Sequence, residues 1–174
     1  MRAFAMKIIA LTMAMVLITA HPALAVLSNL ATFPQTPKLG RIQILNGTGA
    51  YAIASGGATV SNTVAAFTCG SQGSKITGII VGSNDSAARD LTLFMVPASN
   101  VPYIITTVTI PITAGQAAGT PPVNLISPVN VPGLPTDSDG PYLFCESGDV
   151  IRVGVKVAVT ANLLISVLVV GSDY

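Results

Sequence analysis

Val150-Ile151-Arg152-Val153-Gly154-Val155-Lys156-Val157-Ala158-Val159-Thr160 is the most regular stretch of this sequence, and it decides the fold class. Branched apolar residues alternate in it with other residues, among them Arg152, Lys156 and Thr160. Such a period of two is typical of a β-strand that buries one face. We therefore predict a strand over 150–160 whose core-facing side chains are Ile151, Val153, Val155, Val157 and Val159.

Two hairpins are predicted from neighbouring segments. Leu163–Val170 is apolar on both faces apart from Ser166, which is typical of a central strand or of a strand covered by another subunit. The short link before it predicts a hairpin with the 150–160 strand. Lys75–Val81 and Leu91–Val96 form the second predicted hairpin, with Ser83–Arg89 as its polar tip.

Further β-branched segments bring the total to about eight strands, and no segment after residue 25 has a helical apolar period. We expect an all-β fold, a single β-sandwich or jelly-roll-like domain of antiparallel strands. The proline-rich stretch Pro121–Gly140 is expected to be a surface loop that lies over the sandwich. The remaining predicted strands are Arg41–Leu45, Thr63–Cys69, Tyr103–Ile110 and Tyr142–Cys145.

Three regions are predicted along the chain: a leader over 1–25, an extended arm over 26–40 and the β-sandwich over 41–174. The leader has two basic residues, an uncharged apolar run over 8–20, expected to be helical, and Ala23-Leu24-Ala25 as a cleavage site. The run is shorter than the about 20 apolar residues of a membrane-spanning helix, so no stable span is expected in the mature chain. A later start at Met6 or Met13, or a retained hydrophobic arm, is the alternative.

The chain carries very little charge. Of its 174 residues, 9% are charged, whereas about 25% is ordinary, and 51% are hydrophobic. The formal net charge is +1, and the leader holds two of the positive charges, so the rest of the chain has a net charge of −1. No basic patch results, which argues against nucleic-acid binding. We expect such a surface to associate with other subunits, as a homo-oligomer or a member of a lattice.

The residue types needed for catalysis at neutral pH are scarce. The single histidine, His21, lies in the leader, so the mature domain lacks a Ser-His-Asp or Cys-His device and a histidine-containing zinc site. The acids fall in turns or at strand ends, where they normally cap backbone N–H groups. We therefore expect no catalytic, cofactor-binding or metal-binding residues, and no enzyme.

Two loops resemble ligand-binding motifs only in part. Asp137-Ser138-Asp139-Gly140 matches the start of a calcium loop, but the twelfth position, which takes a bidentate acid, is Gly148. We interpret it as a polar turn, the alternative being a site that borrows Asp149. Gly70–Lys75 lacks the ending of a phosphate loop and precedes a strand, so we interpret it as a hairpin turn. The glycosylation sequons at Asn46 and Asn84 are weak three-residue patterns.

Cys69 and Cys145 are the two cysteines. In an exported chain they would form a disulfide, worth a few kcal/mol. In a particle assembled in the cytosol they would remain buried, small apolar residues. Which of the two holds depends on whether the leader is an export signal.

Several turn and strand patterns resemble small virion-associated proteins encoded among the structural genes of tailed bacteriophages. The resemblance spans roughly Thr36–Tyr174, and the two cysteines and the leader are not part of it. Its segments are Thr36-Pro37-Lys38, Gly40–Asn46, Gly73–Ile76, Ser83–Leu93, Val108–Pro111, Ala114-Gly115, Val131–Leu134 and Gly171–Tyr174.

The resemblance implies a β-sandwich that serves as a capsid-surface, decoration or minor structural subunit without catalytic residues. Its partners would be other virion subunits, in the capsid or neck, or copies of itself. Because the leader is atypical of such proteins, a second hypothesis stays open. It is an exported bacterial surface or adhesion module that is stabilised by a Cys69–Cys145 bond. In one version of this hypothesis, the module binds glycans.

Overall fold

The computed structural model describes residues 36–57, 59–98 and 101–174. The chain divides into two units, Met1–Phe33 and Pro34–Tyr174, and all described residues belong to the second. The predicted leader with its helix, and residues 26–35 of the predicted arm, lie outside the described residues. Within the described part, no helix is long and apolar enough to cross a membrane.

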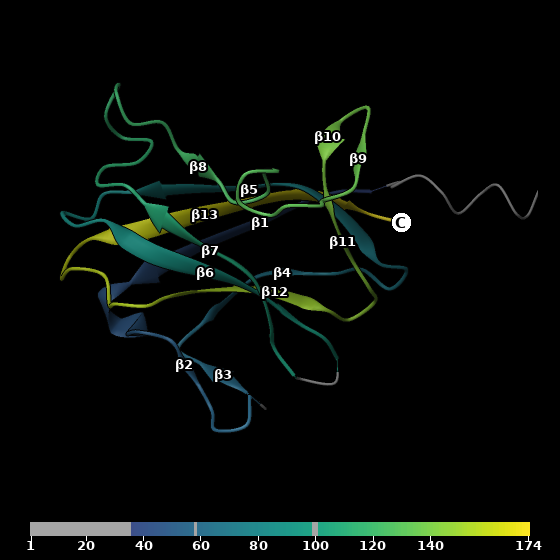
Figure 1. Ribbon diagram of the computed structural model, residues 1–174, viewed down its shortest axis with the longest axis horizontal. Helices are drawn as coiled ribbons and strands as arrows, with labels where there is room; N and C mark the ends of the chain where they lie inside the picture. Colours follow the sequence, from purple (N-terminus) through teal and green to yellow (C-terminus); the bar gives the residue numbers. More distant parts are fainter. Residues whose placement is uncertain (1–35, 58, 99–100) are drawn as a thin grey trace, which may run out of the picture. The chain divides into compact units, whose positions relative to one another are not determined.

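Two antiparallel sheets form the body of the second unit, and they lie as two layers in Figure 1. In sheet I, β13 lies between β1 and β5, and the far edge of β5 pairs with both β11 and β8. The bounds in sheet I are β1 (Thr36–Leu45), β5 (Ser74–Ser83), β8 (Val123–Asn124), β11 (Leu143–Cys145) and β13 (Leu164–Asp173). Sheet II has the order β4 (Val64–Thr68), β12 (Val150–Val155), β6 (Arg89–Val96) and β7 (Tyr103–Ile110).

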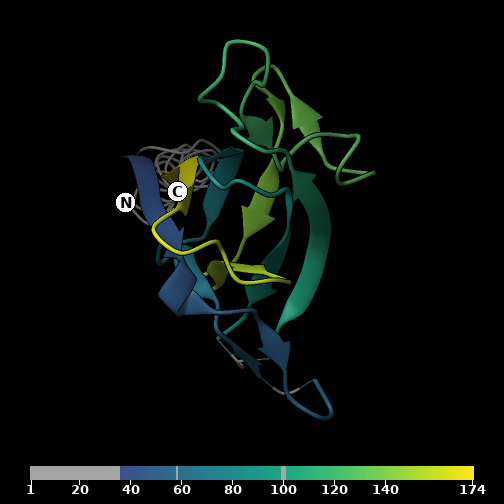
Figure 2. The same ribbon diagram turned by 90° about the vertical axis from the view of Figure 1, so that its left-hand side faces the viewer.

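Short strands and a 3-10 turn lie at the ends of these sheets. Figure 2 shows the hairpin of β2 and β3 at the end opposite to the segment that carries β8, β9 and β10. A single 3-10 turn, η1, follows β1 directly. Their bounds are η1 (Asn46–Thr48), β2 (Ala52–Ile53), β3 (Val60–Ser61), β9 (Thr136–Asp137) and β10 (Gly140–Pro141).

The inward-facing side chains of both sheets form one hydrophobic core. Sheet I contributes Ile44, Ile79 and Val167, and sheet II contributes Leu93 and Ile151, all at most 2% exposed. Every pairing between named strands is antiparallel. The prediction of an all-β, antiparallel fold is confirmed.

The two predicted hairpins are wrong. β5 lies in sheet I and β6 in sheet II, so residues 84–88 cross from one sheet to the other instead of turning back. Likewise, β12 lies in sheet II and β13 in sheet I, so residues 156–163 form a second crossover. The glycine-rich segment after β4 also links sheet II to sheet I, and it is not a hairpin turn. A polar link between two apolar runs fits either connection, because its residues do not specify which sheet the next strand joins.

The strand predicted over 150–160 is shorter than expected. Ile151, Val153 and Val155 are fully buried as predicted, but β12 ends at Val155. Val157 was expected to face the core and is instead 60% exposed, because the chain has already left sheet II at that point. Val159 is buried again where the crossover approaches β13.

Two region boundaries also change. Thr36–Gly40, which was assigned to the extended arm, forms the first half of β1. Part of the predicted surface loop over 121–140 belongs to the body of the fold instead. Its strand β8 pairs with β5, and the side chains of Leu125 and Ile126 are buried in the core. Within this segment, pairing with the main sheets is limited to the two residues of β8 at the edge of β5, as expected for a proline-rich stretch. The side chains of Leu125 and Ile126 still reach the interior.

Candidate functional site

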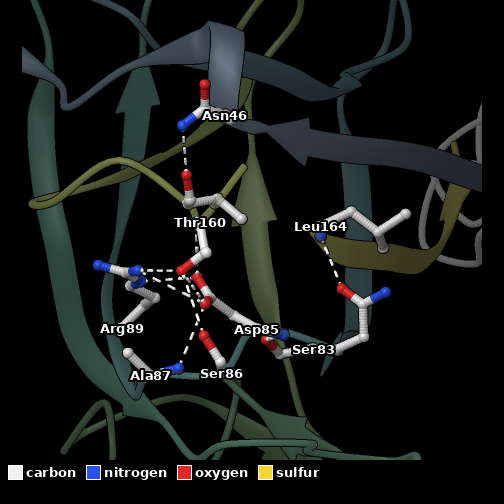
Figure 3. A network of polar contacts seen from close by, with 10 residues as sticks. Asn46, Ser83, Asp85, Ser86, Ala87, Arg89, Thr160 and Leu164 are labelled. Carbon is white, nitrogen blue, oxygen red and sulfur yellow. Dashed lines mark hydrogen bonds and ion pairs between the residues drawn. The ribbon is translucent and has the colours of Figure 1, made fainter. Parts of the chain in front are cut away.

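A polar network joins the two crossovers (Figure 3). The carboxylate of Asp85 is fully buried and accepts a 2.6 Å hydrogen bond from the Thr160 hydroxyl and a 2.7 Å bond from Arg89 Nε. Burial alone would raise the pKa of Asp85, but the hydrogen bonds from Arg89 and Thr160 outweigh it and hold that pKa far below its usual range. The network therefore fixes the crossovers to each other and leaves Asp85 no role as a proton donor near neutral pH.

Asparagine side chains extend this junction. The amide oxygen of Asn84 accepts a 2.6 Å hydrogen bond from the Leu164 N–H group at the start of β13. The side-chain N–H of Asn46 donates a 2.7 Å bond to the Val159 carbonyl (Figure 3). The two asparagines of the weak sequons thus satisfy backbone groups of the second crossover and of the first residue of β13.

The Asp137–Asp139 turn surrounds a lysine. Lys75, whose side chain is 7% exposed, places its ammonium 2.5 Å from Asp137 and 3.0 Å from Asp139. The hydrogen bonds that the Lys75 ammonium donates to the two carboxylates raise the pKa of Lys75 and lower the pKa of Asp137. The Tyr142 ring lies 5.1 Å from the same ammonium. The positive charge beside this turn is thus supplied by the chain itself.

The calcium-loop alternative would have borrowed Asp149 from elsewhere in the fold. Asp149 instead accepts a hydrogen bond from the Glu146 N–H in the turn between β11 and β12. Among the described residues, no group of three or more histidine, cysteine or acidic side chains is placed to hold a metal ion.

Cys69 and Cys145 form a disulfide in the structure. Cys69 follows β4 of sheet II and Cys145 ends β11 of sheet I, so the bond links the two layers. Both residues are at most 5% exposed, and their Cα atoms are 6.2 Å apart.

The outer face of sheet I exposes several apolar side chains on β1 and β13. Its exposed apolar side chains alternate with buried ones along β1 and β13, and cross-strand pairing places Leu39 beside Val170 and Leu45 beside Leu164. Leu39 is 54%, Leu45 49% and Leu168 37% exposed. We call this surface the sheet I outer face; it consists of Leu39, Arg41, Gln43, Leu45, Ile80, Leu164, Ser166, Leu168 and Val170.

A shallow groove of about 570 Å³ lies on the sheet I outer face. Leu168 is flanked by Arg41 on one side and Ile80 on the other, because it pairs with Arg41 of β1 and with Ile80 of β5. The remaining lining residues are Ile42, Gln43, Ser166 and Val167. The groove is thus mostly apolar and holds one guanidinium.

The sequence indicated part of this surface. The two-sided apolar pattern of Leu163–Val170 predicted either a central strand or a strand covered by another subunit, and β13 is central in sheet I while Leu168 remains exposed. Sequence reasoning missed the contribution of β1, although Leu39, Arg41, Gln43 and Leu45 have the period of two that marks one face of a strand.

Comparisons with known proteins assign no family. No protein-family model matches the sequence, and no curated protein matches it. Among solved structures, a chain from the structure of infectious bursal disease virus, Gx strain, has 14% sequence identity and a TM-score of 0.25. The match covers 79% of this chain and 40% of the viral chain, and at this TM-score it assigns neither fold nor function.

Proposed function

We propose that this protein is a non-enzymatic structural subunit of a virion, a single jelly roll that attaches to other subunits through the sheet I outer face. In its specific form the proposal is a capsid-associated, decoration or minor structural subunit of a tailed bacteriophage. The specific form rests on the sequence resemblance described above.

The strand orders support the jelly-roll part of the proposal. A jelly roll consists of two four-stranded antiparallel sheets built from two Greek keys, an architecture used in viral capsid and lectin domains. Sheet II has four strands in the order β4-β12-β6-β7, and sheet I has the order β1-β13-β5-β11 with β8 also paired to β5. Two antiparallel layers between which the chain crosses repeatedly support this architecture. The same architecture occurs in lectins, so it does not select a virion by itself.

The exposure of Leu39, Leu45 and Leu168 on one sheet carries the proposal. Contiguous apolar surface on a soluble protein marks an interaction site. At roughly 25 cal/mol per Å² of apolar area removed from water, covering several such side chains contributes a few kcal/mol to association. Arg41 is the single charged residue on this surface, so little desolvation of charge opposes the contact.

The polar groups support a structural role. Asp85, Asp137 and Asp173 accept hydrogen bonds from basic side chains and tie loops or the chain end to the body of the fold. These carboxylates act as fixed acceptors in the folded protein, which fits a subunit that contributes packing rather than chemistry.

The test is incorporation into particles. Particles produced by a host that encodes this chain are purified, and the chain is quantified in them by mass spectrometry. Leu39→Ser and Leu168→Ser are expected to reduce incorporation strongly, whereas Val157→Ser, which changes an exposed apolar residue outside the strands, is expected to incorporate normally. Absence of the unmodified chain from purified particles would overturn the proposal.

The disulfide favours a second candidate, an exported surface or adhesion module. Disulfides persist mainly in oxidising compartments, and Cys69–Cys145 links the two layers. Non-reducing mass spectrometry of the native protein separates the candidates. An N-terminus at Val26 with bonded cysteines, together with cell-surface location, supports export; an intact leader with free thiols in particles supports the virion subunit.

A further inference from the structure

Nearly every charged side chain in the described part of the chain is held by another group. Arg152, for example, donates from its guanidinium to the Thr63 hydroxyl and carbonyl, both at 2.8 Å. Asp149 accepts from the N–H group of residue 146. The ion pairs are Lys38–Asp173, Lys75–Asp137, Lys75–Asp139, Arg89–Asp85 and Lys156–Asp90.

Within the same described residues, Arg41 and Glu146 are the exceptions. Both are exposed, and neither side chain has a hydrogen-bond or ion-pair partner there. Residues 1–35, 58 and 99–100 contain no aspartate or glutamate. Apart from Glu146, every acidic side chain among the described residues already holds another group, so Glu146 is the one acidic side chain there that is left to pair with Arg41.

The surroundings of the two residues are complementary. Arg41 lies in the groove of the sheet I outer face, next to Leu168. Glu146 directly follows β11, two residues after Phe144, which is 46% exposed. Cys145 and Leu143 pack into or against the core, so Phe144 faces away from it. One surface thus combines apolar side chains with a cation, and the other combines an aromatic ring with an anion.

We propose that the sheet I outer face binds a second copy of this chain, with Glu146 of each copy paired to Arg41 of the other and Phe144 placed over Leu168. Because β1, β13 and β11 all belong to sheet I, a two-fold axis allows both contacts to form at once, which closes the assembly as a dimer. This inference deepens the proposed function, on which it rests: it names a partner for the same surface and the charge pair that sets the orientation.

The test is the oligomeric state of the full chain by sedimentation velocity over a concentration series. The unmodified protein is expected to be a dimer. Arg41→Glu and Glu146→Arg are each expected to raise the dissociation constant about tenfold, because a two-fold dimer then contains two like-charge contacts. The double variant, with both charges exchanged, is expected to regain the dissociation constant of the unmodified protein within about threefold, because opposite charges then face each other again.

Lys156→Glu is the matched control, since it makes the same charge change at an exposed residue outside sheet I, and it is expected to leave the dimer intact. Thermal unfolding of each variant checks that it is folded. A monomer at all concentrations, or a dimer unaffected by both single reversals, would overturn the inference. If such a monomer is nevertheless found in purified particles, the proposed function stands while the dimer is refuted.

Discussion

The Thr160 hydroxyl donates a 2.6 Å hydrogen bond to Asp85 across a sequence separation of 75 residues. These two residues lie in two of the segments that carry the chain between sheet I and sheet II. One buried carboxylate therefore holds two of these connections together. Arg89, with a side chain that is 12% exposed, neutralises that carboxylate.

Replacing Asp85 is expected to be strongly destabilising. Asp85→Ala leaves the Arg89 guanidinium largely buried and removes the acceptor of the Thr160 hydroxyl and backbone N–H. Loss of one partner from a buried pair costs about 3–5 kcal/mol. Urea unfolding of the two proteins measures the difference in free energy of unfolding. A matched control is Asp90→Ala, which removes an exposed pair with a Lys156–Asp90 distance of 3.8 Å and should cost about 1 kcal/mol or less.

The same carboxylate predicts how stability depends on pH. The pKa of Asp85 is lower in the folded protein than in the unfolded chain. The contribution of Asp85 to stability is therefore fully present at pH values above its pKa in the unfolded chain, about 3.9. This contribution is lost as the pH falls from there toward the lower pKa of the folded protein. Melting temperatures between pH 7 and pH 2.5 should fall for the unmodified protein. Because Asp137 and Asp173 also have lowered pKa values, Asp85→Asn should flatten this fall without abolishing it. Equal slopes would contradict the assignment.

The sequence predicted most strands but not their partners. The alternation of Ile151, Val153 and Val155 is a local property, because burial of one strand face requires a period of two wherever the strand lies. The two crossovers depend on Asp85 and Thr160, which are distant in sequence, and the local pattern around either residue is equally compatible with a hairpin. The sequence therefore located the polar segment 83–89 correctly, but the hairpin predicted between the strands on either side of it was wrong.

The candidate surface was predicted only in part for the same reason. Leu163–Val170 showed that β13 is apolar on both faces, but the sequence alone did not show that Leu39 and Arg41 lie next to it. That neighbourhood is set by the pairing of β1 with β13, the two ends of the described chain. Leu125 and Ile126 are adjacent apolar residues, a pattern that fits a core contact. The prolines of the segment led instead to the prediction of a surface loop.

Lys75 is expected to hold the β9–β10 hairpin in place rather than to stabilise the whole fold. In Lys75→Met the carboxylates of Asp137 and Asp139 are left without a cation, but they are 39% and 69% exposed and regain water. The rate of limited proteolysis within residues 132–142 should rise several-fold, because local opening no longer breaks these contacts. The change in the free energy of unfolding caused by Lys75→Met should be only slightly larger than the change caused by Asp139→Asn, which is the control. Unchanged cleavage in Lys75→Met would refute this role.

Removal of the disulfide should destabilise the protein while leaving the sheets intact. Cys69–Cys145 closes a loop with a sequence separation of 76, and loss of such a constraint on the unfolded chain costs about 2–4 kcal/mol. Double substitution to serine, compared with the unmodified protein in urea unfolding with and without reductant, measures this cost. Reductant should lower the stability of the unmodified protein alone. Equal stabilities without reductant would contradict the prediction.

Gly40 provides a further test, because β1 passes close to β4 there. A Cβ atom added at Gly40 would be 2.0 Å from the backbone oxygen of Ala66, which no side-chain rotation relieves. Gly40→Ala must therefore push β1, or β1 together with its neighbour β13, away from β4. Overpacking of this kind lowers the free energy of unfolding by about 1–3 kcal/mol. Gly119→Ala, where a Cβ atom would meet nothing within 4 Å, is the control and should stay within about 0.5 kcal/mol. Because β1 carries Leu39 and Arg41, a displaced β1 should also weaken the proposed dimer, whereas the Gly119 control should leave it unchanged.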